Sequence, residues 1–119
     1  MSIRLELPLR VISLANARTH WRKRAPYVRD CRTVARLMVK AELRYAVRLP
    51  LMVTLTRIGR NLMDDDNLAA ALKPIRDGIA DGLNLPNDRD GLIWRYQQEI
   101  DRRGQPRVIV EIAQAATIR

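Results

Sequence analysis

Three consecutive aspartates are the residues of this sequence whose type and spacing most clearly suggest chemistry. Asp64, Asp65 and Asp66 are followed directly by Asn67, and Lys73 comes two helical turns later. Two carboxylates about 5 Å apart repel each other by roughly 3 kcal/mol at an effective dielectric constant of about 20, so a pair in a cleft needs a cation. Mg²⁺ takes oxygen ligands from a few carboxylates, waters and substrate phosphates. The segment therefore points to a Mg²⁺ site, although a lone aspartate here would be an ordinary helix cap.

The spacing of the aspartates predicts how they are presented. We expect residues 62 to 66 to be extended and Asp66 to be the N-cap of the following helix. Side chains alternate along an extended segment, so Asp64 and Asp66 would point to one side and Asp65 to the other. The motif is then Asp-x-Asp, with two carboxylates directed at one ion.

The helix that we expect from Asn67 to Gly82 has one polar and one apolar face. At about 100° per residue, Lys73 and Asp77 share the direction of Asp66. Because helical side chains lean towards the N-terminus, the Lys73 ammonium can reach back towards the carboxylates, although Pro74 is expected to kink the helix or mark a new start. The opposite face predicts a buried stripe, made of Leu68, Leu72, Ile75, Ile79 and Leu83.

A third carboxylate can come from the turn ahead of the next strand. Asp88 and Asp90 flank Arg89 in this turn, and Asn87 precedes them. They can approach Asp66 only if the strands on either side of the helix are neighbours in the sheet. Asparagine, aspartate and glycine are also common turn residues, so a purely structural role stays open.

Positive charge is concentrated in the first half of the chain. The formal net charge of +9 divides into +11 for residues 1–60 and −2 for residues 61–119. A basic half beside a compact acidic segment favours a polyanionic partner, with a basic protein that has no such partner as the alternative.

Two basic segments are candidates for contact with DNA. We expect residues 10–26 to be an exposed loop and residues 27–46 to be a helix whose cations form one stripe, which either contacts phosphates or is merely solvated. Trp21 can stack on an unpaired nucleobase or enter the core. His20 contacts DNA, is merely exposed or acts as the catalytic base. The candidate DNA-binding residues are Arg18, His20, Trp21, Arg22, Lys23, Arg24, Arg29, Arg36 and Lys40.

The remaining pattern predicts a single α+β domain over residues 1–119, with two helices, a small mixed sheet and the order β-α-β-α-β-β. Alternation and turn signals place the strands at residues 3–9, 51–58, 92–100 and 107–113. We expect Cys31 to be a small core residue. Without a signal-like N-terminus or a run of about 18 apolar residues, the chain is expected to be soluble and cytoplasmic.

One set of residues resembles the RusA family of Holliday junction resolvases, which are often encoded by phages and prophages. The set is Asp64-x-Asp66-Asn67-Leu68, followed by Lys73, Asp77 and the Asn87-Asp88 pair. The resemblance implies a homodimeric endodeoxyribonuclease that cuts four-way DNA junctions symmetrically with Mg²⁺. It implies that Asp64, Asp66 and Asp88 are metal ligands and that Lys73 is required for cleavage.

Two departures from the family pattern affect this assignment. Lys73 lies three residues farther from Asp66 than in the best-known member, and Asp90 can replace or assist Asp88 as the third ligand. A non-catalytic, phage-derived DNA-binding protein that retains the fold, and a basic scaffold protein, remain the alternatives.

Overall fold

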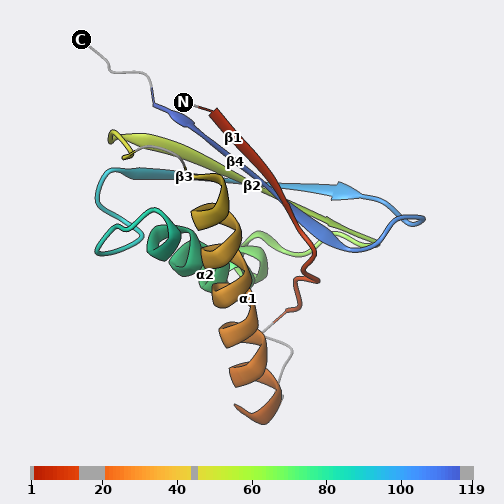
Figure 1. Cartoon of the computed structure of the whole chain (residues 1–119). Coiled ribbons are helices and arrows are strands. Elements are labelled where there is room, and N and C mark those ends of the chain that lie inside the picture. Colours follow the sequence, from red (N-terminus) through yellow and green to blue (C-terminus); the bar gives the residue numbers. More distant parts are fainter. Residues whose placement is uncertain (1, 14–20, 44–45, 116–119) are drawn as a thin grey trace.

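The structure, a computed structural model, describes residues 2–13, 21–43 and 46–115. It confirms the predicted α+β fold and the order β-α-β-α-β-β (Figure 1). The elements are β1 (Ser2–Leu7), α1 (Trp21–Glu42), β2 (Leu51–Gly59), α2 (Asp65–Gly82), β3 (Leu92–Ile100) and β4 (Arg107–Gln114).

The four strands form one mixed sheet in the order β1-β4-β2-β3. β4 is antiparallel to both of its neighbours, whereas β2 and β3 are parallel and pair from Leu51↔Leu92 to Gly59↔Ile100. Parallel neighbours need a crossover connection, and α2 provides it. As a result, α2 begins at the end of the sheet where β2 finishes and ends where β3 starts (Figure 1).

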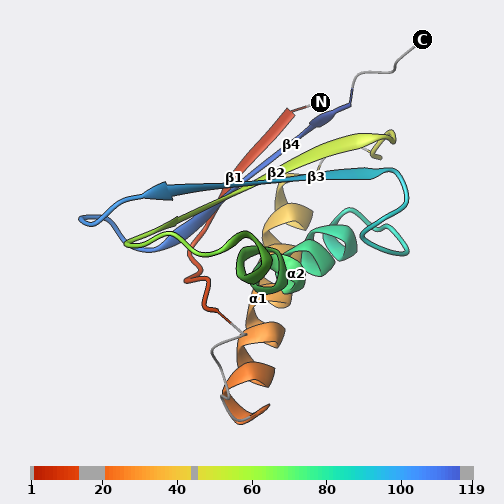
Figure 2. The ribbon, with the colours of Figure 1, turned by 180° about the vertical axis from the view of Figure 1, so that it is seen from behind.

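Both helices cover the same face of the sheet, as the two opposite views show (Figures 1 and 2). The strands alternate, and their inward side chains pack against the helices to form the core with Leu7, Val53, Leu55, Val110 and Ile112 among them. The predicted apolar stripe of α2 is confirmed because all five of its residues are buried, and Cys31 is buried as predicted. Within the described ranges, neither helix has the length and hydrophobicity needed to cross a bilayer.

The two helices approach each other closely at two glycines of α2. A Cβ added to Gly78 would collide with the carbonyl oxygen of Arg32, and one added to Gly82 would lie 2.8 Å from that of Arg36. A paired hydrogen bond joins the helices beside this contact, with Arg32 donating to both carboxylate oxygens of Asp81 at 2.7 and 3.1 Å. One cation of the predicted stripe on α1 is therefore committed to the fold.

The first helix is longer at its start than the sequence predicts. Residues 21–26, which were expected to belong to a loop, form the first turns of α1. These turns project beyond α2 and the sheet (Figure 1). A helix segment that projects beyond the other elements needs no apolar stripe, so it shows no helical periodicity, while its arginines and lysine favour helix formation.

Helix α2 continues through Pro74, which is buried within it. Proline has no backbone N–H and its ring disturbs the preceding turn, so carbonyl groups there need other partners. The hydroxyl of Tyr27, on α1, donates to the carbonyl oxygen of Ala71 at 2.9 Å. The carbonyl that loses its helical donor to Pro74 is that of Ala70, so the Tyr27 bond ties α1 to the turn before the proline and does not replace the missing bond.

Candidate active site

The aspartates lie at the start of α2, which begins two residues earlier than predicted. Asp64, with φ −61° and ψ 149°, is the N-cap, and its carbonyl oxygen accepts the first helical hydrogen bond from the Leu68 N–H at 2.8 Å. Asp65 and Asp66 are therefore in the first turn, and the predicted extended alternation with Asp66 as cap is wrong.

All three aspartates are exposed, and the Asp64 side chain makes no capping hydrogen bond. Its Oδ2 is 3.5 Å from the Asn67 side-chain nitrogen, which is at the limit of a hydrogen bond. The positive end of the helix stabilises each nearby carboxylate by about 0.3–1 kcal/mol. The carboxylates are thus clustered at the helix start and accessible to a ligand.

Lys73 links the polar face of α2 to the turn before β3. Its ammonium nitrogen lies 2.9 Å from Asp77 Oδ1 and 2.7 Å from Asp88 Oδ2. Lys73 and Asp77 share one helix face as predicted, and Asp88 joins them. The Lys73 side chain, however, points to these two acids and not back to the aspartates at the helix start, because the turn supplies a nearer carboxylate.

The Asp88 carboxylate is held from several sides and is only 5% exposed. Arg76 Nη2 lies 3.0 Å from the same Oδ2 atom that Lys73 contacts, and the Asp88 carbonyl oxygen accepts a 2.6 Å bond from Trp94 Nε1. The Arg76 guanidinium stacks 4.9 Å above the centre of the Trp94 ring and donates to the Tyr96 hydroxyl at 2.6 Å. Asp88 therefore anchors the turn to both α2 and β3.

Burial and neighbouring cations act on the Asp88 pKa in opposite directions. Burial raises this pKa, but the hydrogen bond from Lys73 and the charges of Arg76 and Lys73 outweigh it and bring the pKa below its ordinary value. The hydrogen bonds to Asp88 and then Asp77 raise the pKa of Lys73. Both groups are charged at neutral pH, so Lys73 is a fixed cation here and not a proton acceptor.

Asp90, the other candidate in this turn, has a different setting. The Asn87 side-chain oxygen accepts hydrogen bonds from the Arg89 and Asp90 N–H groups at 2.9 and 2.8 Å. The Asn87 amide in turn donates to Asp90 Oδ2 at 3.0 Å, and Asp90 is exposed. Asp90 thus closes the turn, whereas Asp88 is the residue that reaches α2.

The structure does not gather the four predicted ligands, Asp64, Asp66, Asp88 and Asp90, into one group. Among the described residues, no three aspartate, glutamate, histidine or cysteine side chains are close enough to share a metal ion. The reason lies in the crossover. β2 and β3 are neighbours, as the prediction required, but α2 carries the chain to the opposite end of the sheet before the turn. Asp88 returns only as far as Lys73, roughly 10 Å along the helix from Asp66.

The segment just before the aspartates is fixed by the side chain of Gln98, on β3. Its amide donates to the Met63 carbonyl at 2.9 Å, and its carbonyl accepts from the Met63 N–H at 2.9 Å and from Arg57 Nη1 at 3.2 Å. Arg57 also donates to the Asn61 carbonyl at 2.6 Å. These bonds set where the chain enters α2.

Sequence reasoning missed five residues that support the site, namely Arg57, Arg76, Trp94, Tyr96 and Gln98. Trp94 packs against the core, and its indole N–H also bonds the Asp88 backbone. A signal was present in β3, where alternate residues carry large side chains with polar tips. Such residues on the inward face of an edge strand can bond the elements that cover it.

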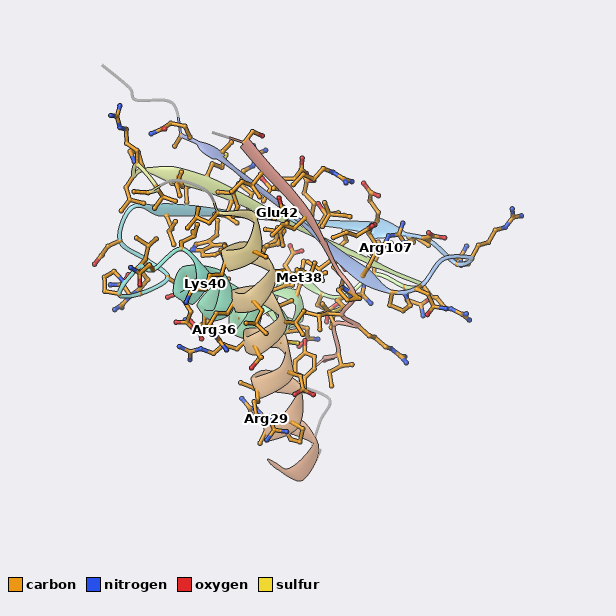
Figure 3. All side chains as sticks on the ribbon, in the orientation of Figure 1. Arg29, Arg36, Met38, Lys40, Glu42 and Arg107 are labelled. Carbon is orange, nitrogen blue, oxygen red and sulfur yellow. The ribbon has the colours of Figure 1, made fainter. Side chains whose placement is uncertain are left out.

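The candidate DNA-binding residues fall into two groups. Arg18 and His20 lie outside the described residues, as do the side chains of Trp21, Arg22 and Lys23, whose backbone belongs to α1. Arg24, Arg29 and Lys40 are exposed on α1 and Arg36 is half-buried. Arg29, Arg36 and Lys40 are spread along the length of the helix (Figure 3).

Comparison with known proteins gives a family but no activity. No protein-family model matches the chain. Over 110 residues it is 34% identical to an uncharacterized protein of Xylella fastidiosa (strain Temecula1 / ATCC 700964), and the match covers 87% of this chain and 71% of that protein. The chain therefore belongs to the same family as the Xylella protein.

Proposed function

We propose that this protein is a Mg²⁺-dependent, structure-selective endodeoxyribonuclease of the RusA type that resolves four-way (Holliday) DNA junctions by symmetric phosphodiester hydrolysis. The observation that carries the proposal is the contact between Lys73 and Asp88 on the helix that begins with Asp64 and Asp66. The residues that the resemblance implies are thus presented by one helix and the turn beside it. The homodimer and the cytoplasmic location are parts of the same proposal.

The aspartates at the helix start suit a hard divalent ion. Asp64 and Asp66 are exposed carboxylates, and Mg²⁺ is commonly held by one or two carboxylates with waters and substrate phosphates. When bound, the ion would supply an activated water and neutralise charge on the phosphate. Carboxylate oxygens are the donors that Mg²⁺ takes, whereas Asp88, whose Oδ2 already faces two cations, fits a positioning role for Lys73 better than a role as third ligand.

Lys73 has the charge and exposure needed to act on a phosphate. Its side chain is 51% exposed, and Asp77 and Asp88 hold the ammonium from two sides. A cation fixed in advance stabilises negative charge that develops on the phosphate or the leaving oxygen without having to reorganise. Lys73 would therefore stabilise the transition state, and Asp88 would orient Lys73.

One observation favours a second candidate, a non-catalytic DNA-binding protein of phage origin that retains this fold. The described residues contain no group of three carboxylates, and the buried Asp88 is engaged by two cations. A protein that had lost cleavage could keep the basic surfaces and this ion pair as parts of its fold.

A synthetic four-way junction and a linear duplex of the same sequence, each incubated with Mg²⁺ or with EDTA, separate the candidates. The proposal predicts paired nicks in the junction with Mg²⁺ and an intact junction with EDTA. Retarded but uncut junction under both conditions would establish the DNA-binding protein instead. No salt-sensitive DNA affinity at all would leave a basic scaffold protein.

A further inference from the structure

A basic pocket lies at the end of the sheet where β2 finishes and α2 begins. Its volume is about 400 Å³, and three arginines line it, Arg10, Arg57 and Arg60, together with Gly59, Asn61 and Gln105. No acidic side chain lines the pocket, and none of the ion pairs in the described part of the chain includes these arginines. Positive charge is therefore gathered here, and no carboxylate of the residues that the structure describes lines the pocket.

The central arginine of the pocket is fixed in place. Arg57 donates to the Asn61 carbonyl at 2.6 Å and to the Gln98 side chain at 3.2 Å. Its guanidinium also lies against Gly59, where a Cβ would come within 2.8 Å of Nη2. Burial lowers the pKa of Arg57, and the nearby charge of Arg10 lowers it further. The fold thus holds the positive charges of Arg57 and Arg10 near each other, and Gly59 leaves room for the Arg57 guanidinium.

We propose that this pocket binds a phosphate group, supplied by the DNA backbone. Arginine forks match the oxygens of phosphate, and several of them around one cavity are typical of phosphate recognition. The volume is within the range of small-molecule sites and admits a phosphate with part of its nucleotide. Asn61, in the pocket wall, is three residues before Asp64, so a strand held here would run close to the aspartates.

The choice of DNA as the source rests on the proposed function, whereas phosphate binding does not. Two variants test the pocket with little risk to folding. Arg10→Ala with Arg60→Ala removes two exposed cations, and Gly59→Ala keeps all the charges but displaces the Arg57 guanidinium from the position in which Asn61 and Gln98 hold it. The matched control is Arg4→Ala with Arg95→Ala, which removes the same charge from exposed positions in β1 and β3 away from the pocket.

The first measurement is a titration with inorganic phosphate, followed by the NMR shifts of the Gly59, Asn61 and Gln105 amides. We expect saturable shifts in the wild type and in the control pair, at least tenfold weaker binding in Gly59→Ala, and no saturation in Arg10→Ala with Arg60→Ala. The inference is overturned if the wild type shows no shifts or if the pocket variants bind like the control.

The second measurement is the affinity for a four-way junction in EDTA at several salt concentrations, so that cleavage plays no part. Loss of the one phosphate contact should reduce the magnitude of the slope of log K against log salt by about 1 and weaken binding at least tenfold, with a smaller effect for the control pair. Phosphate binding without this change would assign the pocket to a free phosphate and exclude the DNA source. Because neither measurement depends on catalysis, an inactive protein would contradict the proposed function and leave this inference standing.

Discussion

At the Asp88 carboxyl group, burial favours the neutral acid and two cations favour the carboxylate, and the cations prevail. A folded-state pKa below the ordinary value of 3.8 means that the charged form contributes stability above pH 4 and loses it as the pH falls through the folded-state pKa. We expect Asp88→Asn to lower the free energy of unfolding by about 1–3 kcal/mol at pH 7, since it leaves Arg76 without its carboxylate. Chemical denaturation of both proteins from pH 7 to pH 2 measures this difference, which should shrink below pH 4.

The control for this residue is Asp90→Asn, which changes the same charge two positions away in the same turn. Asp90 is exposed and faces only the Asn87 amide, so its replacement should change stability by less than about 0.5 kcal/mol. Equal destabilisation by both variants, or a difference that does not depend on pH, would contradict the anchoring role of Asp88.

The sequence predicted part of this residue-scale arrangement. The angle of about 100° between successive helical residues was enough to place Lys73 and Asp77 on one face. The contact of Arg76 with Trp94 and Tyr96 joins α2 to a later strand, and a one-dimensional pattern contains no register between the two. The direction of Lys73 depends on the same long-range packing, so it was predicted wrongly.

Among the elements, the contact between α1 and α2 can be tested at Gly78. Alanine is the better helix former by about 0.5–1 kcal/mol, so Gly78→Ala would stabilise a helix that was free at this position. Here the added methyl group meets the Arg32 carbonyl of the facing helix. We expect a net loss of about 1–3 kcal/mol in the free energy of unfolding, measured by urea denaturation.

Ala70 is exposed on the same helix, so a substitution there changes helix propensity without changing the packing between α1 and α2. Ala70→Gly should cost about 1 kcal/mol from propensity alone. If Gly78→Ala instead raised stability by a similar amount, the helices would not be packed as closely as the structure indicates.

The sequence predicted the elements wherever a buried face imposes a period. Alternation located β2 and β3 because one side of each strand faces the core, and the five apolar residues of α2 fixed its buried side. The start of α1 was missed because its first turns project beyond α2 and the sheet, so no apolar stripe marks them (Figure 1). The start of α2 was displaced because three successive aspartates are all acceptable caps, and only the bond to the Asp64 carbonyl distinguishes them.

For the whole molecule, the fold separates charge by position. The exposed cations of α1 and the three pocket arginines all precede the acidic helix start in the sequence, and the crossover places that start at the same end of the sheet as the pocket. Such an arrangement lets a basic surface hold a polyanion while a few carboxylates recruit a divalent ion. If this protein is the proposed nuclease, the aspartates at the start of α2 are needed for cleavage of DNA and not for DNA affinity.

The most direct test compares Asp66→Asn with Asp65→Asn on a synthetic four-way junction. Both variants remove one carboxylate from the same helix turn, so their folding and net charge are matched. We predict that Asp66→Asn binds the junction with wild-type affinity in EDTA but cuts it at least 100-fold more slowly with Mg²⁺, a loss of about 2.7 kcal/mol in transition-state stabilisation. Asp65→Asn should keep most of the activity, because the resemblance to the RusA family implies Asp64 and Asp66, and not Asp65, as metal ligands. Cleavage by Asp66→Asn at the wild-type rate would contradict the account.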